Sequence, residues 1–180
     1  MFFNNWLEQI ERLKIDRPSK EPFKRLDCAE RVSNFNEDLF NKFLTTLNQE
    51  DFITYPSYAE YGDIEKKIAE YISISKECIS IGTGSDSCIK DLMQTTLKKN
   101  SEILSISPCF PMYFIYGATF NSRFKSVGYE NFNKNGFDAF YKLINDKTSL
   151  VIFTNPGSPF GYFYESKEVE KLVIFLKKRD

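Results

Sequence analysis

The sequence contains no histidine, and this absence excludes several kinds of active site. Neither a Ser-His-Asp triad nor a Cys-His pair can be built without an imidazole as the base. A general base supplied by this chain must therefore be Lys, Asp, Glu, Tyr or Cys. The four cysteines, Cys28, Cys78, Cys88 and Cys109, include no C-x-x-C pair, and their spacing does not suit a zinc site. They are typical of reduced cysteines in a cytoplasmic protein, and we expect that location and no metal.

The chain also lacks an excess of charge of either sign. Its 24 basic and 25 acidic side chains are mixed along the sequence and leave a net charge of -1. Proteins that bind nucleic acid or anionic membranes usually carry a concentrated basic patch. No apolar run is long enough to cross a bilayer, and the first residues lack the basic-then-apolar pattern of a signal peptide. We therefore expect neither nucleic acid nor membrane as a partner.

Apolar and aromatic residues are plentiful, at 42% and 16% of the 180 residues, which is enough to fill a core. Their spacing alternates between strand-like and helix-like segments along most of the chain. The expected strands are residues 78–81, 103–106, 125–129 and 150–153, and the expected helices are 6–13, 36–48, 59–73, 89–97, 111–117, 137–145 and 166–178, the last with Ser166 as its N-cap. This alternation predicts an α/β fold with a mostly parallel sheet and flanking helices.

In such a sheet, ligands bind beyond the carboxyl ends of the strands, so the loops that follow the strands are of most interest. Residues 82–86, with the sequence Gly-Thr-Gly-Ser-Asp, join a predicted strand to a helix. Glycines allow a sharp turn, and free N–H groups at a helix start can hold a phosphate. The same segment is equally consistent with a plain tight turn in which Ser85 or Asp86 is an ordinary N-cap.

Two further loops carry candidate ligand-binding side chains. Phe110 follows the strand at 103–106, where its ring can stack on a planar ligand, although an aromatic in this position is more often part of the core. Asn155 follows the strand at 150–153, where its amide can donate to a ligand oxygen. An Asn-Pro pair is also a common turn initiator, so both interpretations of Asn155 stay open.

Taken together, the three loops resemble the fold-type I aminotransferases that depend on pyridoxal 5'-phosphate (PLP), in particular the histidinol-phosphate aminotransferase-like branch of class I/II. The resemblance begins near Arg25 and includes Tyr55-Pro56 and residues 81–86, 107–113 and 155–161. The last of these segments is similar to the family's Asn-Pro-Asn-Asn-Pro-Thr-Gly loop. It departs from that pattern at Gly157, Ser158 and Phe160, where Asn, Asn and Thr are commoner.

The resemblance implies a role for each matching residue. Backbone N–H groups of Gly84, Ser85 and Asp86 would hold the phosphate of PLP. Phe110 would stack on the pyridine ring, and Asn155 would donate a hydrogen bond to the phenolic oxygen of the ring. Tyr55 resembles the tyrosine that reaches the cofactor phosphate of the neighbouring subunit in the family homodimer, although Tyr55 is also explained as an apolar anchor beside Pro56.

The family pattern also implies a domain organisation. Residues 1–50 would form an N-terminal arm and helix, which belong to the small domain in relatives. Residues 51–180 would form the N-terminal half of the PLP-binding, aspartate aminotransferase-like large domain. The Schiff-base lysine and the Asp that pairs with the pyridine nitrogen are expected beyond Asp180, so no catalytic residue is assigned within this chain.

The expected function is amino-group transfer between an amino acid or amino acid phosphate and a 2-oxo acid. The chain alone would then be inactive. Alternatives are a truncated fragment that binds PLP or a partner without turnover, and a relative of the PLP-dependent decarboxylases. A nucleotide-binding module is least favoured, because the strand at 103–106 ends in Ser107-Pro108 and not in an acidic residue suited to a ribose.

Overall fold

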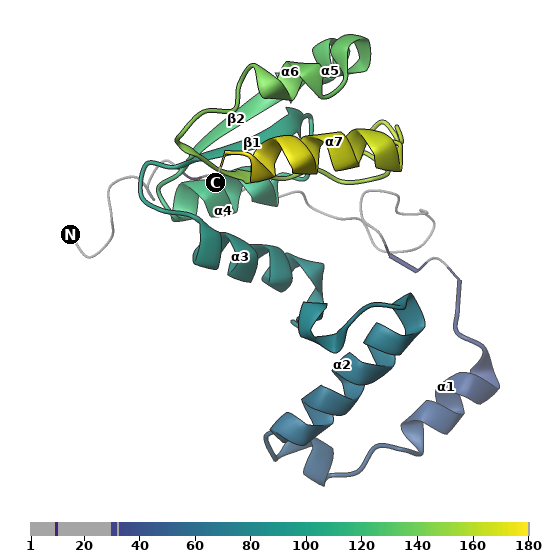
Figure 1. Ribbon diagram of the computed structural model, residues 1–180. Helices are drawn as coiled ribbons and strands as arrows, with labels where there is room; N and C mark the ends of the chain where they lie inside the picture. Colours follow the sequence, from purple (N-terminus) through teal and green to yellow (C-terminus); the bar gives the residue numbers. More distant parts are fainter. Residues whose placement is uncertain (1–9, 11–29, 32, 180) are drawn as a thin grey trace. The chain divides into compact units, whose positions relative to one another are not determined.

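A computed structural model describes residues 10, 30–31 and 33–179 of the chain (Figure 1). The described residues belong to two compact units, and the chain passes from one to the other between Ile81 and Gly82. We call residues 82–179, together with Ile10, the sheet unit and residues 30–31 and 33–81 the helical unit, and we treat each by itself. The predicted division into residues 1–50 and 51–180 refers to the small and large domains of relatives. It stays a prediction. The helix expected at 6–13 lies outside the described residues, apart from Ile10.

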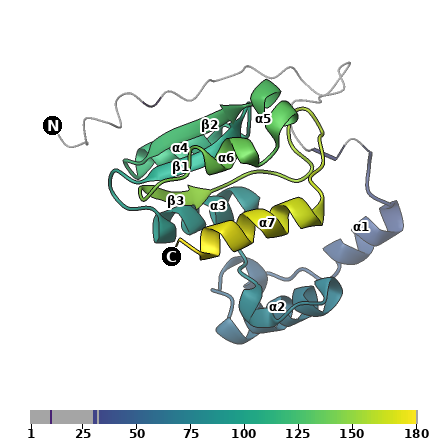
Figure 2. The ribbon, with the colours of Figure 1, turned by 45° about the horizontal axis from the view of Figure 1, so that its top comes forward.

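The sheet unit contains three parallel strands in the order β2-β1-β3 (Figure 2). They are β1 (Glu102–Ser107), β2 (Arg123–Gly128) and β3 (Thr148–Val151). In the register of the sheet, Ile103 of β1 lies opposite Phe124 of β2 and Leu150 of β3. The predicted α/β fold with a parallel sheet is therefore confirmed, and the three later strands lie within two residues of their expected positions.

Helices cover both faces of this sheet because β1 is apolar on both sides. Ile103 packs with residues of α3 (Gly84–Thr96) and α4 (Met112–Thr119). Leu104 and Ile106 face the opposite way, toward α5 (Tyr129–Asn135), α6 (Asp138–Tyr141) and α7 (Ser166–Lys177). Alternate side chains of a strand point to opposite faces, so a strand with apolar side chains on both faces is expected to be buried between two helical layers.

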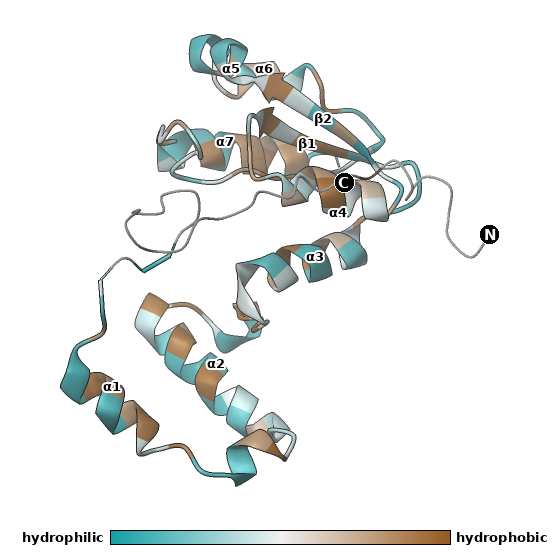
Figure 3. Cartoon of the chain, turned by 180° about the vertical axis from the view of Figure 1, so that it is seen from behind, coloured by the Kyte–Doolittle hydropathy of each residue, from teal (hydrophilic) through white to brown (hydrophobic). Residues whose placement is uncertain are grey.

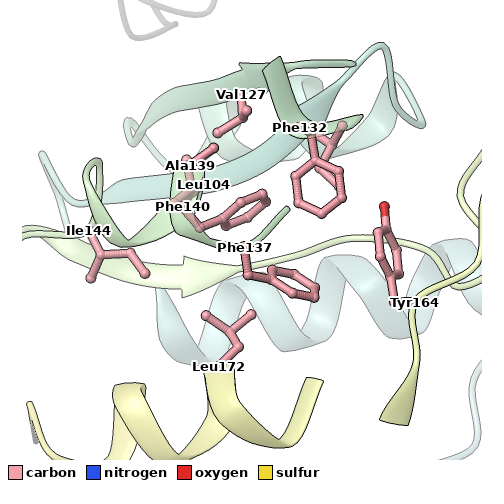
Figure 4. Close-up of a cluster of buried hydrophobic side chains, with 10 residues drawn as sticks. Leu104, Val127, Phe132, Phe137, Ala139, Phe140, Ile144, Tyr164 and Leu172 are labelled. Atoms are coloured by element: carbon pink, nitrogen blue, oxygen red, sulfur yellow. The ribbon is translucent and has the colours of Figure 1, made fainter. Parts of the chain in front are cut away.

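The core beneath α5, α6 and α7 contains a group of aromatic rings among aliphatic side chains (Figure 4). Phe140 is fully buried, and its ring lies 5.5 Å from that of Phe132 and 5.6 Å from that of Phe137, with both pairs in edge-to-face geometry. Tyr164 joins the same group at 5.3 Å from Phe132. Edge-to-face pairs add a directional attraction to the apolar burial, so this cluster fixes how α5 and α6 lie on the sheet.

The helical unit is built from α1 (Glu37–Leu44), α2 (Tyr58–Ile72) and the short 3-10 turns η2 (Glu50–Phe52) and η3 (Lys76–Cys78). Local capping explains where the two helices begin. The side chain of Asn36 accepts a hydrogen bond from the N–H of Leu39, and Ser57 forms a reciprocal capping box with Glu60. These caps satisfy N–H groups that a helix start leaves without partners.

Both helices of this unit are amphipathic, with apolar and polar residues on different sides (Figure 3). Their apolar side chains nevertheless stay exposed in the described part of the chain. The exposed residues are Leu39, Phe40, Phe43 and Leu44 of α1 and Tyr61, Ile64, Ile68 and Ile72 of α2. Apolar surface of this extent is typical of an interaction site. None of the helices that the structure describes is long and apolar enough to span a membrane.

Three local predictions are wrong in detail. The strand expected at 78–81 is absent, because η3 occupies Lys76–Cys78 and the next residues have no strand neighbour to bond with. The helix expected at 137–145 is the short α6, preceded by the unpredicted α5 and separated from it by Gly136, which has a φ of 54°. Ser166 is the first residue of α7, and its N-cap is Glu165.

Candidate functional site

The three loops singled out in the sequence all belong to the sheet unit. Phe110 follows the carboxyl end of β1, and Asn155 follows that of β3. Since β1 and β3 are parallel neighbours, their carboxyl ends lie at the same edge of the sheet. The third loop starts α3, which packs against α4 and β3. The fold therefore brings the loops of Phe110 and Asn155 to one edge, the usual location of ligand sites in parallel sheets.

The start of α3 offers free backbone donors. Thr83 is the N-cap, and its side chain makes no capping hydrogen bond, so the alternative in which Ser85 or Asp86 is the N-cap is excluded. The N–H of Gly84 donates to the carbonyl oxygen of Gly82 at 2.8 Å, and Gly84 has a φ of 82°. The N–H groups of Ser85 and Asp86 lie in the first turn, where a helix provides no acceptor.

Asp86 adds an unpaired acceptor at this helix start. Its Oδ1 atom is buried and has no hydrogen-bond partner among the described residues. The turn before it is tight, because a Cβ on Gly82 would overlap the Ser87 hydroxyl and come within 2.8 Å of the Cys88 sulfur. A buried oxygen without a donor is unfavourable, so this position has hydrogen-bonding capacity left for a ligand or a water molecule.

Phe110 is held by a contact with one neighbouring ring and is partly exposed. Its ring makes an edge-to-face contact with Tyr113, with the ring centroids 5.7 Å apart. Tyr113 is buried against β1 and α3, whereas 39% of Phe110 is exposed. An aromatic ring fixed in this way can stack on a planar ligand without a large rearrangement.

Asn155 is held in one orientation by the backbone of Tyr164. Its side-chain N–H donates to the Tyr164 carbonyl oxygen at 3.2 Å, and its Oδ1 accepts from the Tyr164 N–H at 3.1 Å. A carboxamide has two N–H donors, so one of them stays available for a ligand oxygen. Sequence analysis did not identify Tyr164, because its contact with Asn155 is made by backbone groups that almost any residue type would provide.

The hydroxyl of Tyr164 is itself an unusual feature of the core. It is buried without a hydrogen-bond partner in the described part of the chain, and burial raises the pKa of this phenol. Because a buried polar group without a partner is unfavourable, we expect Tyr164→Phe to raise the free energy of unfolding by about 1 kcal/mol. Urea titration measures this change. Tyr55→Phe, which alters a fully exposed side chain, serves as the control, and a loss of stability in Tyr164→Phe would contradict the prediction.

Tyr55 lies in the helical unit, between η2 and α2, and its side chain is fully exposed. It belongs to a different unit from the other candidates, and its role stays a prediction. Among residues 10, 30–31 and 33–179, no group of three His, Cys, Asp or Glu side chains is arranged to hold a metal ion.

The chain belongs to the aminotransferase class I and II family, whose sequence profile matches residues 27–180. It is 27% identical over 150 residues to a histidinol-phosphate aminotransferase of Clostridium novyi, an alignment that covers 83% of this chain and 42% of the relative. A relative with the same description from Mannheimia succiniciproducens is 28% identical over 127 residues, covering 70% of this chain and 34% of the relative. The chain thus spans about two fifths or less of the length of these curated relatives.

Solved structures agree with the fold. An aminotransferase from Eubacterium rectale superposes with a TM-score of 0.68 at 21% identity, over 79% of this chain and 38% of the other. Histidinol-phosphate aminotransferase from Sinorhizobium meliloti, solved in complex with pyridoxal-5'-phosphate, gives a TM-score of 0.65 at 16% identity, over 77% and 37%. At these identities the likeness concerns the fold.

Proposed function

We propose that this chain is the N-terminal part of a PLP-dependent aminotransferase that moves an amino group between an amino acid, or an amino acid phosphate, and a 2-oxo acid. The observation on which this rests is the family match across residues 27–180, which includes all three loops. The matched relatives named histidinol-phosphate aminotransferase favour a phosphorylated amino donor. A cytoplasmic location is consistent with this function.

Each candidate residue has a physical reason for its proposed role. The N–H groups of Ser85 and Asp86 would bind the phosphate of PLP, helped by the positive end of the α3 dipole. Gly84, whose own N–H is already bonded to Gly82, would shape the turn and allow the phosphate to approach closely. Phe110 would stack on the ring, and the free N–H of Asn155 would donate to its phenolic oxygen. When bound, PLP supplies the electron sink for the chemistry at the amino acid.

The proposal places the Schiff-base lysine outside this chain. The chain alone would then bind the cofactor without turning over substrate, and its part in catalysis would be to hold and orient PLP. The activity of the whole protein would depend on residues that the matched region of 27–180 does not include.

We also propose a homodimer as the working form. The exposed apolar residues of α1 and α2 are of the kind that protein interfaces bury. Tyr55, fully exposed in the segment between α1 and α2, would donate a hydrogen bond from its hydroxyl to the cofactor phosphate of the partner subunit.

Pyridoxamine 5'-phosphate is a suitable probe of this proposal, because its amine cannot form a Schiff base with surface lysines. We expect it to bind saturably to the 180-residue chain and to shift the NMR signals of the Ser85 and Asp86 amides, with inorganic phosphate as a competitor. Phe110→Ala should weaken the binding of pyridoxamine 5'-phosphate by roughly tenfold, because one aromatic stacking contact is lost. The binding of inorganic phosphate should be unaffected.

Phe114→Ala is the matched control for this experiment. Phe114 is also an exposed aromatic with one edge-to-face contact, to Phe124, but it lies outside the three loops. Equal weakening of pyridoxamine 5'-phosphate binding by both variants would show that the chain has no cofactor site at these residues. Saturable binding without any shift of the Ser85 and Asp86 amide signals would show the same.

A further inference from the structure

The loop from Asn155 to Tyr164 closes on itself like a small hairpin. The N–H of Gly157 donates to the Tyr162 carbonyl oxygen at 2.6 Å, and these two residues form an antiparallel bridge. The next pair outward is Asn155 and Tyr164, which are joined by the two hydrogen bonds of the Asn155 carboxamide. The orientation of this carboxamide is therefore coupled to the closure of the loop.

The bend of this loop is held by a ring from a distant part of the chain. The chain turns at Gly161, which has a φ of 71°, and Phe160 and Tyr162 flank the turn. Tyr129, the first residue of α5 directly after β2, stacks on both of them, with centroid distances of 4.0 Å to Phe160 and 5.1 Å to Tyr162. We call Tyr129, Phe160 and Tyr162 the aromatic clamp.

Two departures from the family pattern are parts of this arrangement. Phe160, where the family usually has Thr, supplies the ring that stacks most closely on Tyr129. Gly157, where Asn is commoner, leaves room for the ring of Tyr162, since a Cβ on Gly157 would overlap that ring. The two changes therefore act together, because one provides a stacking partner and the other makes space for the second ring.

We infer that Tyr129 is a positioning residue for Asn155, which it acts on through the aromatic clamp and the Gly157–Tyr162 bridge. By fixing both sides of the bend, Tyr129 keeps the loop closed and presents the free N–H of Asn155 in one direction. That this fixed N–H helps to orient a bound cofactor rests on the proposed function. The coupling between Tyr129 and Asn155 is a property of this chain alone and can be measured without a ligand.

The side-chain amide of Asn155 is the reporter, observed by NMR in the full 180-residue chain and assigned by its loss in Asn155→Asp. In the unchanged chain the two amide protons should be well separated in chemical shift, because one is bonded to Tyr164. In Tyr129→Ala and in Phe160→Thr we expect the separation to collapse to that of an unstructured Asn. The bonded proton should also exchange with solvent roughly tenfold faster.

Conservative and matched variants make the experiment decisive. Tyr129→Phe keeps the stacking ring and should keep the signal of the unchanged chain. Phe163→Ala removes a ring from the same loop that is 69% exposed and lies outside the aromatic clamp, so it should have no effect. Amide protection in β1 shows whether each variant is folded, and Phe160→Thr changes a half-exposed side chain, so the core stays intact.

An unstructured Asn155 signal in the unchanged chain would overturn the inference. A signal that stays unchanged in Tyr129→Ala and Phe160→Thr would overturn it as well. Failure of the proposed function would look different, since pyridoxamine 5'-phosphate would then not bind while Asn155 still responded to the clamp variants.

Discussion

Replacing Phe140 with alanine is expected to lower the free energy of unfolding of the sheet unit by about 3–5 kcal/mol. Phe140 is fully buried and contacts the rings of Phe132, Phe137 and Phe153. Its removal loses the transfer free energy of the ring and leaves a cavity that the neighbouring rings cannot fill. A loss of this size is a large share of the roughly 5–15 kcal/mol that stabilises an ordinary domain.

Urea titration followed through the NMR amide signals of β1 measures this loss, because these signals report on the sheet unit alone. Phe163→Ala is the matched control, since it removes the same atoms from a largely exposed position and should change stability by less than about 0.5 kcal/mol. Equal urea midpoints for the two variants would mean that the aromatic cluster does not form the core described above.

The second large effect is expected at Glu102, at the amino end of β1. Its buried carboxylate lies 2.7 Å from the ammonium of Lys125 and accepts a hydrogen bond from the Asn145 amide at 2.8 Å. Glu102→Ala leaves both donors without their acceptor. We expect a loss of about 3 kcal/mol, the low end of the range for a broken buried pair, because Lys125 can still reach water.

The same residue predicts how stability depends on pH. The hydrogen bonds from Lys125 and then Asn145 hold the pKa of Glu102 below its ordinary value of 4.5. A carboxyl whose pKa is lowered by folding contributes stability that is fully present above the unfolded pKa and is lost as the pH falls through the folded pKa. Stability should therefore decrease below about pH 4.5, and less steeply in Glu102→Gln than in the unchanged chain.

Urea titrations at neutral and acidic pH test both expectations. Asp146→Asn is the control, because Asp146 is fully exposed and its contact with Arg179 is 3.6 Å long, so its contribution should be close to zero. If Asp146→Asn and Glu102→Gln flattened the acid limb of the stability curve to the same extent, the pair at Glu102 would not be the cause.

Much of the candidate site could be predicted from local sequence. Gly84 and its neighbours mark the turn at the start of α3 through backbone freedom alone, and short apolar segments locate β1 and β3. The order of the three loops was specific enough to suggest the family, and the match over residues 27–180 confirms it. These features depend on residue type and short-range spacing, which a sequence displays directly.

Other features depend on contacts between distant parts of the chain. Residues 79–81 have the composition of a strand but no strand neighbour in the described residues, and pairing cannot be read from composition. Tyr129 and Phe160 are 31 positions apart in the numbering. They come into contact only because the residues that follow β2 and the residues that follow β3 lie at the same edge of the parallel sheet. The sequence by itself determined the fold class, the family and the candidate residues, because local chemistry specifies them. The tertiary structure decided how Asn155 is held, because its partners are a backbone and rings that only the folded chain brings together.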